Sequence, residues 1–549
     1  MKRLSILLML LITVVLTAGA QKMSYNILHE VDTTVQVKLS GINLGSRQVR
    51  YYRYEYPSKD TDGNGVTISG IIMAPTDIVE GSVPCDGVVL FNHPTIGAPS
   101  QAPSQGGLEG PSAMLANPLK PNYIIVMSDY IGYGSSIGHK ICYLAGETNA
   151  RNSLDGLLAA RQLFEDKKIP QGKYLFNVGY SQGATESMYV AKLRDMEYKD
   201  KGITFDKTFV GGGMLDCEKA YSEYVKKDQC DAINDVAMFL ISVNENFHVG
   251  IKYSDLFKEP LASNVEEVIK TKDKGVLSRI GVNALDSLHQ LLQPAYMDLS
   301  TPQAQTLLKK LAEIKITNGW EPDLTQRYYL EHSRHDNYVP IQCSRAMVTW
   351  MREKGFKPSL VPGKTNLQTA MIVFKLKHQQ SGIVWAIQTM AAIQFWPVAY
   401  YEGDLNRYYY GAVKDLDVMK VLTTLEKWGL DVRKLVNKKA PEYQNRANLG
   451  PLFSLIPGLK DALAKVDLTP DDLSEMLEDS GITEVDVAKV ALYLLGLNSS
   501  APANESLASM MSNDSEALAP LFLQRLYETR LADWYKACGR DVEYEKWAW

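Results

Sequence analysis

Residues 174–191 read YLFNVGYSQGATESMYVA, and this stretch decides the fold class. Its apolar start is typical of a buried strand, and the apolar residues after the turn recur at the spacing of a helix. Between the two, Gly179, Ser181 and Gly183 form the pattern G-x-S-x-G. Strand, glycine-flanked serine and helix in that order are typical of a nucleophile elbow, in which the glycines leave room for a strained turn. We therefore predict that Ser181 is a catalytic nucleophile.

A second G-x-S-x-G pattern, at residues 134–138, lacks this context. The strand expected at 123–127 ends well before it, and no helix with apolar periodicity begins at Gly138. The context therefore favours Ser181 over Ser136 as the nucleophile. The remaining alternative is that the chain has no nucleophilic serine.

Short apolar segments alternate with helical ones before and after this turn. Two β-rich segments, 49–56 and 65–73, flank the turn-forming cluster 60–64 and predict a hairpin near the start. The alternation that follows predicts an α/β fold in which helices flank a mostly parallel sheet. The expected strands of that sheet lie at 87–91, 123–127, 174–178, 208–211, 328–331 and 370–376.

The chain of 549 residues is longer than a domain with a single hydrophobic core usually is, and the alternation of strands and helices stops after Asp216. We expect helices in the next segment, for example at 265–270 and 284–293, that form a lid or cap. Helices that only buttress the sheet are the alternative. The expected parts are a signal peptide (1–20), the first part of an α/β core (21–217), a helical insertion (218–325), the second part of the core (326–402) and a helical C-terminal region (403–549).

The N-terminal segment is typical of a secretory signal peptide. Lys2 and Arg3 precede an apolar run at 4–16, and a small-residue cleavage site ends at Ala20. We predict export to the periplasm or the medium after cleavage near Ala20, the alternative being an uncleaved anchor. No other segment is long and apolar enough to cross a bilayer, so we expect no membrane span in the mature chain.

The charge balance bears on the kind of partner. The formal net charge is −5, and loss of Lys2 and Arg3 takes it to −7. A mildly acidic chain is not expected to have nucleic acid or an anionic membrane as its main partner. We expect a small-molecule or acylated substrate instead. The composition leaves the oligomeric state open.

Cysteine and histidine patterns predict no metal site. The six cysteines are scattered and form no C-x-x-C, which argues against structural zinc. Cys217 and Cys230 are candidates for a disulfide or for free buried thiols. His332 and His335 form an H-x-x-H without a further Cys or His partner, so local loop hydrogen bonding is the better account of both.

A serine hydroxyl becomes a useful nucleophile when a histidine accepts its proton and a carboxylate orients that histidine. On a doubly wound sheet with a nucleophile elbow, the chain order is serine, acid, histidine. Asp336 follows the late strand at 328–331, where the acid is expected, and only His378 comes after it. The predicted triad is therefore Ser181, Asp336 and His378. Asp216 is the alternative acid, because it also follows a strand.

The assembled order resembles that of the α/β-hydrolase superfamily and, within it, secretory-lipase-like and related exported esterases. Residues 92–95 (NHPT) follow a strand where the family usually carries His-Gly-x. Residues 129–134 (DYIGYG) resemble the family's D-Y-x-G-x-G loop, and 153–157 (SLDGL) resemble the helix before the elbow strand. The resemblance covers roughly 45–216 and 326–395.

This resemblance implies that Ser181, Asp336 and His378 act as nucleophile, orienting acid and base. It implies hydrolysis of a carboxylic ester through an acyl-enzyme, without a metal or an organic cofactor. A serine peptidase on the same fold is one alternative, since the triad itself does not choose between ester and amide. A catalytically degenerate binding scaffold is the other.

The resemblance also implies an oxyanion hole with two backbone N–H donors. One is the N–H of Gln182, the residue after the nucleophile, and the other comes from the loop after His93. Pro94 occupies the family's usual glycine position there and has no N–H. The second donor is then expected to be Thr95, with Ile96 as the alternative.

Overall fold

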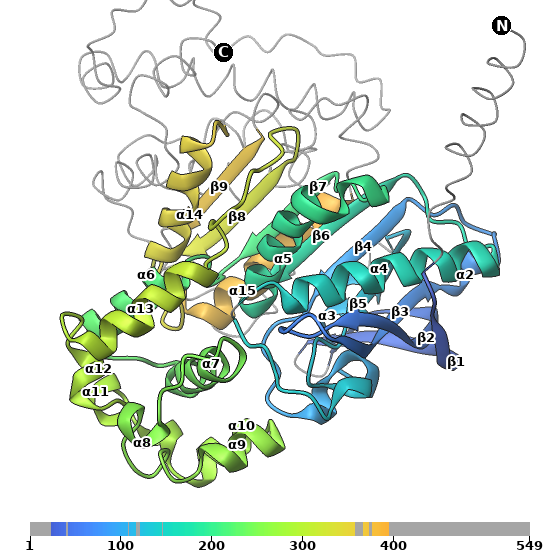
Figure 1. The fold of residues 1–549 in the computed structure, drawn as a ribbon. Helices are drawn as coiled ribbons and strands as arrows, with labels where there is room; N and C mark the ends of the chain where they lie inside the picture. The colour runs from blue at the N-terminus through green and yellow to red at the C-terminus, as the bar shows by residue number, and fades with distance from the viewer. Residues whose placement is uncertain are drawn as a thin grey trace, which may run out of the picture.

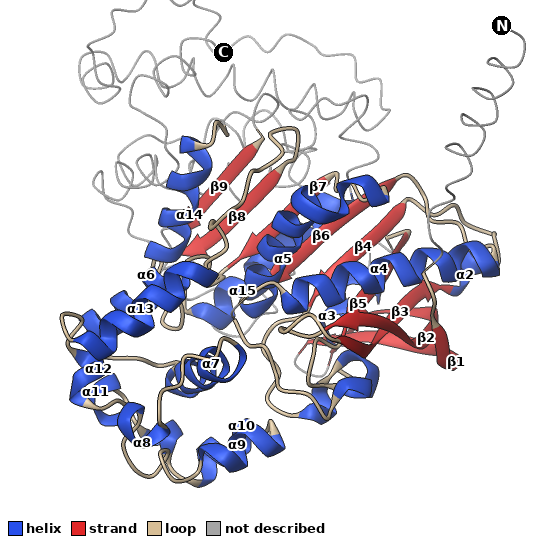
Figure 2. Cartoon of the chain, in the orientation of Figure 1, coloured by secondary structure: helices blue, strands red, loops and turns tan. Residues whose placement is uncertain are grey.

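The computed structural model describes residues 23–39, 42–107, 109–116, 121–144, 146–356, 366–372 and 376–394 (Figure 1). The predicted signal peptide (1–20) and C-terminal helical region (403–549) lie outside them. One sheet runs through the described part, with helices on both of its faces (Figure 2). Among the described helices, none has both the length and the apolar character that crossing a bilayer requires.

Within the described residues the sheet has nine strands in the order β1-β2-β3-β5-β4-β6-β7-β8-β9. The strands from β5 to β9 pair in parallel, whereas β1, β2 and β3 pair antiparallel with their neighbours. The expected mostly parallel sheet is thereby confirmed. The strands are β1 (Asn26–Leu39), β2 (Ile42–Lys59), β3 (Gly65–Pro75), β4 (Gly87–Asn92), β5 (Tyr123–Ser128), β6 (Tyr174–Tyr180), β7 (Lys207–Gly211), β8 (Tyr328–Ser333) and β9 (Leu367–Ile372).

The central strands are buried along their whole length. Every residue of β4, β5 and β7 is buried, which explains why β4 and β5 are almost entirely apolar rather than alternating. The expected hairpin is also present: Lys59 pairs with Gly65, and the Asp60 carboxylate accepts hydrogen bonds from the backbone of the turn that joins β2 to β3. Local sequence therefore accounts for both the hairpin and the central sheet.

Two layers of helices cover this sheet (Figures 1 and 2). One face is covered by α4 (Thr148–Lys167), α5 (Gln182–Leu193) and α14 (Gln342–Glu353), and the other by α3 (Glu109–Ala116) and α15 (His378–Gln394). The short α2 (Thr76–Val79) follows β3. Leu154, Met188 and Met351 are fully buried in the first layer. Met114 and Trp385 are buried in the second. Apolar side chains thus meet the sheet from both sides.

The segment between β7 and β8 folds as helices with a hydrophobic core of its own. Cys217 and Cys230 lie buried in it as free thiols. The predicted helix at 265–270 corresponds to α9. The helices are α6 (Cys217–Lys227), α7 (Ile233–Asn246), α8 (Tyr253–Leu256), α9 (Val265–Thr271), α10 (Lys274–Arg279), α11 (Leu288–Leu291), α12 (Pro294–Met297) and α13 (Pro302–Ile314). We refer to residues 218–325 as the insertion.

One expected helix of the insertion is wrong as a continuous element. The segment 284–293 contains only the single turn α11 in its middle. Ser287 before it and Leu292 after it have extended backbones, because each forms an isolated antiparallel bridge, with Gln229 and Phe257 respectively. Tertiary pairing therefore overrides the helical periodicity of this stretch.

Two features elsewhere also differ from the sequence-based expectation. The last strand begins at Leu367 rather than at 370, because it pairs residue by residue with β8; of its predicted range, residues 373–375 lie outside the described residues. The helix after it begins at His378. The strand β1 was not expected. It is the edge of the sheet, most of its described side chains are at least partly exposed, and its sequence is largely polar.

Candidate active site

The turn between β6 and α5 holds Ser181 in a backbone conformation that few non-glycine residues adopt. Its φ is +58° and its ψ is −122°. A Cβ added to Gly179 would lie 2.0 Å from the carbonyl oxygen of Gly183, and one added to Gly183 would lie 2.1 Å from that of Asn92. Side chains at either position would overlap backbone. The two glycines are therefore what lets the chain turn so sharply here.

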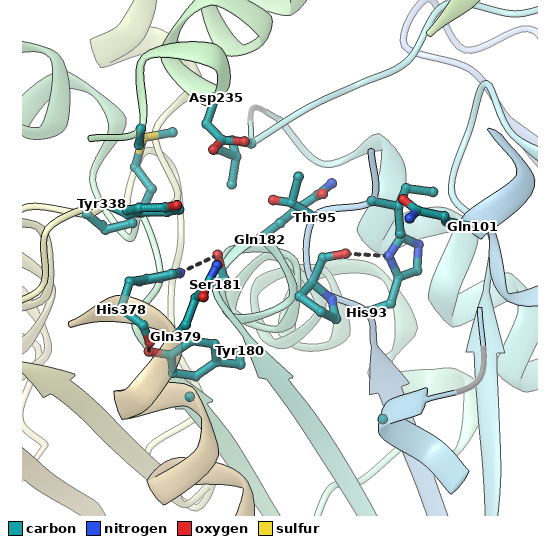
Figure 3. A pocket seen from close by; sticks show the side chains of 18 of the residues that line it. His93, Thr95, Gln101, Tyr180, Ser181, Gln182, Asp235, Tyr338, His378 and Gln379 are labelled. Carbon is teal, nitrogen blue, oxygen red and sulfur yellow. Dashed lines mark hydrogen bonds between the residues drawn. The ribbon is translucent and has the colours of Figure 1, made fainter. Parts of the chain in front are cut away.

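Ser181, His378 and Asp336 form one hydrogen-bonded chain across the ends of β6, β8 and β9. Figure 3 shows the part of it that joins His378 to Ser181. The Nε2 atom of His378 lies 2.8 Å from the Oγ of Ser181, and its Nδ1 lies 2.7 Å from the Oδ2 of Asp336. The other oxygen of Asp336 accepts backbone N–H bonds from Tyr338 and Val339, both 2.8 Å long. The three predicted residues are thus adjacent, although 197 positions separate the serine from the histidine.

The Asp336 carboxylate is held in its charged form. Burial by itself would raise the pKa of this carboxyl, but the hydrogen bond from His378 and the charges of His378 and His332 outweigh it and lower the pKa. A carboxylate of this kind can fix the tautomer of the imidazole and stabilise its protonated form. The arrangement can therefore carry a proton from a serine hydroxyl to a histidine.

Three further residues hold His378 that the sequence did not single out. The ring of Tyr338 stacks on the imidazole, with centroids 5.1 Å apart and planes 12° apart. Tyr180 donates a hydrogen bond to the carbonyl oxygen of His378, over 2.6 Å, and the backbone N–H of His378 donates to Asn337 Oδ1, over 3.0 Å. Their only signal in the sequence is that each stands next to a predicted triad residue or one position beyond it.

The alternative nucleophile and acid occupy structural positions. Ser136 is buried in a single helical turn, where its hydroxyl donates to the carbonyl of Tyr133, over 2.8 Å, and accepts from the N–H of Gly132. Asp216 caps the N-terminus of α6 and accepts a hydrogen bond from the N–H of Lys219, over 2.9 Å. Each side chain is thus explained by local hydrogen bonding.

His332 is a buried neighbour of the triad acid. One ring nitrogen lies 2.7 Å from the hydroxyl of Ser344, and the other lies 3.0 Å from the carbonyl oxygen of Val339. Burial lowers the pKa of His332, which favours the neutral ring. His332 lies in β8 and Ser344 in α14, so the expected local loop hydrogen bonding describes only the contact with Val339. Among the described residues, no group of three or more His, Cys, Asp or Glu side chains could hold a metal ion.

The predicted oxyanion donors lie at the same cavity as Ser181. Gln182 is the first residue of α5, where backbone N–H groups have no partner within the helix. Thr95 and Ile96 both line the cavity beside them, so both remain candidates for the second donor. The ring of His93 is buried, and its Nδ1 bonds the carbonyl of Pro94 over 2.8 Å. His93 therefore shapes the loop that carries Thr95 (Figure 3).

The cavity has a volume of about 1360 Å³ and two unlike ends, with Ser181 and His378 between them. The apolar end lies against α3 and α15 and is lined by Phe91, Pro111, Met127, Trp385, Ala386 and Met390. The polar end is formed largely by the insertion and is lined by Asp231, Asn234, Asp235, Lys274 and Asn283, together with Tyr143. A substrate bound here would meet apolar groups on one side and hydrogen-bonding groups on the other.

A buried carboxyl lies one helical turn behind Gln182. Glu186 accepts hydrogen bonds from Asn149, over 3.0 Å, and from the side chain of Gln182, over 3.3 Å. Burial dominates and raises the pKa of Glu186 to about 8, whereas both hydrogen bonds act in the opposite direction. The folded state therefore binds a proton that the unfolded chain releases near pH 4.5.

The pH dependence of the free energy of unfolding should reflect this carboxyl. Because the pKa of Glu186 is higher in the folded state, its contribution to the free energy of unfolding is fully present below about pH 4.5. This contribution falls as pH rises towards 8. We expect Glu186→Gln to flatten the pH dependence of the free energy of unfolding between pH 5 and 8, measured by urea denaturation. The exposed Glu266→Gln is the matched control and should leave it unchanged. An unaltered slope in Glu186→Gln would contradict the assignment.

Comparison with known proteins identifies relatives in structure. No protein-family model matches the chain, and neither does any curated protein. A candidate hydrolase of Legionella pneumophila is 18% identical with a TM-score of 0.57, and the match covers 69% of this chain and 98% of that one. The rice cell wall degrading esterase LipA of Xanthomonas oryzae is 17% identical with a TM-score of 0.54, covering 69% and 97%. At identities of 17% and 18%, this structural similarity shows a shared fold.

Proposed function

The chain has the α/β-hydrolase fold, and on that premise we propose that it hydrolyses carboxylic esters through an acyl-enzyme formed on Ser181. The observation that carries the proposal is the hydrogen-bonded chain from Ser181 through His378 to Asp336. It joins a strained, glycine-flanked serine to a base and a charged acid, which is the minimum that nucleophilic acyl transfer requires. The same fold carries an esterase in Xanthomonas oryzae.

The proposed reaction has two halves. His378 Nε2 accepts the proton of Ser181 as the hydroxyl oxygen attacks the ester carbonyl, and Asp336 stabilises the imidazolium that forms. The backbone N–H groups of Gln182 and Thr95 stabilise the negative oxygen of the tetrahedral intermediate. His378 then protonates the leaving alcohol. Water, activated by the same histidine, hydrolyses the acyl-enzyme and restores the serine.

The cavity supports esters with an apolar acyl group. Apolar side chains from β4, β5, α3 and α15 line the same cavity as the nucleophile. Burying apolar surface contributes about 25 cal/mol per Å² to binding, so a chain of several carbons would bind more tightly than acetate. The insertion supplies the opposite wall and would act as the cap over the site. Export of the enzyme through the predicted signal peptide completes this proposal.

The proposal is tested by offering esters and amides side by side. We expect turnover of p-nitrophenyl esters, with kcat/KM rising from acetate to butyrate or longer acyl groups, and far slower release from peptidyl p-nitroanilides. Faster cleavage of the anilides would instead identify a peptidase. No turnover of any substrate, combined with no labelling by a fluorophosphonate, would identify a binding scaffold and refute the proposal.

A further inference from the structure

A line of hydrogen bonds leads from the oxyanion loop into the insertion. The hydroxyl of Thr95 lies 2.8 Å from that of Tyr143, which donates to the Asp235 carboxylate over 2.7 Å. Lys274 forms an ion pair with the same carboxylate oxygen. Since a tyrosine hydroxyl has one proton and Tyr143 gives it to Asp235, Thr95 must be the donor to Tyr143. The orientation of the Thr95 side chain is therefore set by these three residues.

The residues of this line come from three separate elements. Tyr143 lies in the loop between β5 and α4, Asp235 in the first turn of α7, and Lys274 at the start of α10. All of them, with Thr95, line the cavity that holds Ser181. Figure 3 shows Thr95 and Asp235 there. Burial raises the pKa of Tyr143 well above its ordinary value, so its hydroxyl keeps the proton that it donates.

A second contact joins the loop that carries Thr95 to the start of α10. The backbone N–H of Lys274 donates to the carbonyl oxygen of Gly97, over 2.7 Å. The helix start is itself fixed, because Asp273 caps it by accepting from the N–H of Gly275 over 2.7 Å. Close by, Lys272 donates to the carbonyl of Ile137. The insertion thus grips the oxyanion loop at two positions, the Thr95 side chain and the Gly97 backbone.

We propose that Tyr143, Asp235 and Lys274 are positioning residues that hold the Thr95 amide where the oxyanion of the reaction forms. The insertion is then part of the catalytic apparatus as well as a wall of the cavity. This inference rests on the proposed function. Loss of an oxyanion donor reduces turnover about 10²- to 10³-fold, and misplacement of a donor by a fraction of an ångström gives part of that loss.

Tyr143→Phe is the first variant that tests the inference. It removes the acceptor of the Thr95 hydroxyl and keeps the ring, so we expect kcat for p-nitrophenyl butyrate to fall about 10- to 100-fold with KM changed less than about two-fold. Tyr253→Phe is the matched control. It also removes a hydrogen bond from tyrosine to a carboxylate in the insertion, the 2.5 Å bond to Glu245, but Tyr253 does not line the cavity. Its kcat should equal that of the parent enzyme.

A double-mutant cycle separates positioning from direct contact with substrate. Thr95→Val removes the hydroxyl and keeps the backbone N–H, so its kcat should fall by a similar factor, while Thr95→Ser should keep most of the activity. If Tyr143 acts only through Thr95, the double variant Thr95→Val/Tyr143→Phe should be no slower than either single one. Multiplied losses would mean that Tyr143 contacts substrate, and they would overturn the inference.

Two further outcomes are decisive. Parental kcat in a Tyr143→Phe protein with an unchanged thermal midpoint would overturn the inference, and so would equal activity in Thr95→Val and Thr95→Ser. If Tyr143→Phe fails to fold, the Thr95 pair still decides, because it tests the same hydrogen bond from its other end. Esterase activity that survives Ser181→Ala would instead refute the proposed function. Failure of the two ideas can therefore be told apart.

Discussion

Ser181→Ala should lower kcat for p-nitrophenyl butyrate by about 10⁵- to 10⁶-fold, the scale seen when the nucleophile of a serine hydrolase is removed. Alanine cannot form the acyl-enzyme, and His378 then has no hydroxyl to activate. The positive φ at this position already disfavours any side chain, and alanine introduces no larger one, so the fold should persist. The measurement is the initial rate on the purified protein, together with labelling by a fluorophosphonate probe. We expect labelling of the parent and none of the variant.

The chain supplies its own control for this prediction. Ser136 stands in a second G-x-S-x-G pattern, but its buried hydroxyl bonds to the backbone of Gly132 and Tyr133. Ser136→Ala should keep parental kcat and labelling, with at most a lower thermal midpoint. Labelling that survives Ser181→Ala but disappears in Ser136→Ala would show that Ser136, and not Ser181, is the nucleophile.

Asp336→Asn should reduce kcat by about 10⁴-fold with little change in KM, because asparagine offers an N–H where the imidazole needs an acceptor and so favours the wrong tautomer. The 2.7 Å contact with His378 and the two backbone N–H bonds to the other oxygen show how closely this carboxylate is held. The measurement is kcat and KM with the same ester. Parental kcat in a folded Asp336→Asn protein would remove Asp336 from the mechanism.

Asp216→Asn is the matched control for the acid. Asparagine caps a helix about as well as aspartate, so both kcat and the thermal midpoint should stay close to the parental values.

The pH dependence of the free energy of unfolding gives a second test of Asp336. Because the pKa of Asp336 is lowered by folding, its ionisation stabilises the protein above the ordinary carboxyl range, and this contribution is lost as pH falls. The stability gap between the parent and Asp336→Asn should therefore narrow on acidification.

The strands that position the site could be predicted because their burial is visible in the sequence. Buried on both faces, β4 and β5 are almost entirely apolar, and the predicted bounds of β4, β5 and β7 differ from the observed ones by one residue. The edge strand β1 lacked such a run, since most of its described side chains are exposed. The turn α11 was missed as an isolated element, because the two bridges that bound it join segments far apart in the chain.

The residues of the candidate site also fall into those that the sequence predicted and those that it did not. Residue type and chain order single out Ser181, Asp336 and His378, since only one histidine follows the acid. Chain order says nothing about Tyr143, Asp235 and Lys274, whose contacts span 92 and 39 positions between unrelated loops and helices. No periodicity or motif marks them, and only the docking of the insertion brings them together.

By itself, the sequence determined the elbow, the parallel strands around it and the order of the three candidate catalytic residues. These features depend on short-range effects: glycine freedom at a turn, burial of apolar runs and the chemistry of side chains that follow strands. The tertiary structure alone decided which side chains hold the histidine, which side chains line the cavity, and that the insertion contacts the Thr95 loop. Those contacts join surfaces of separately formed elements, and their free energy arises only when the elements pack together.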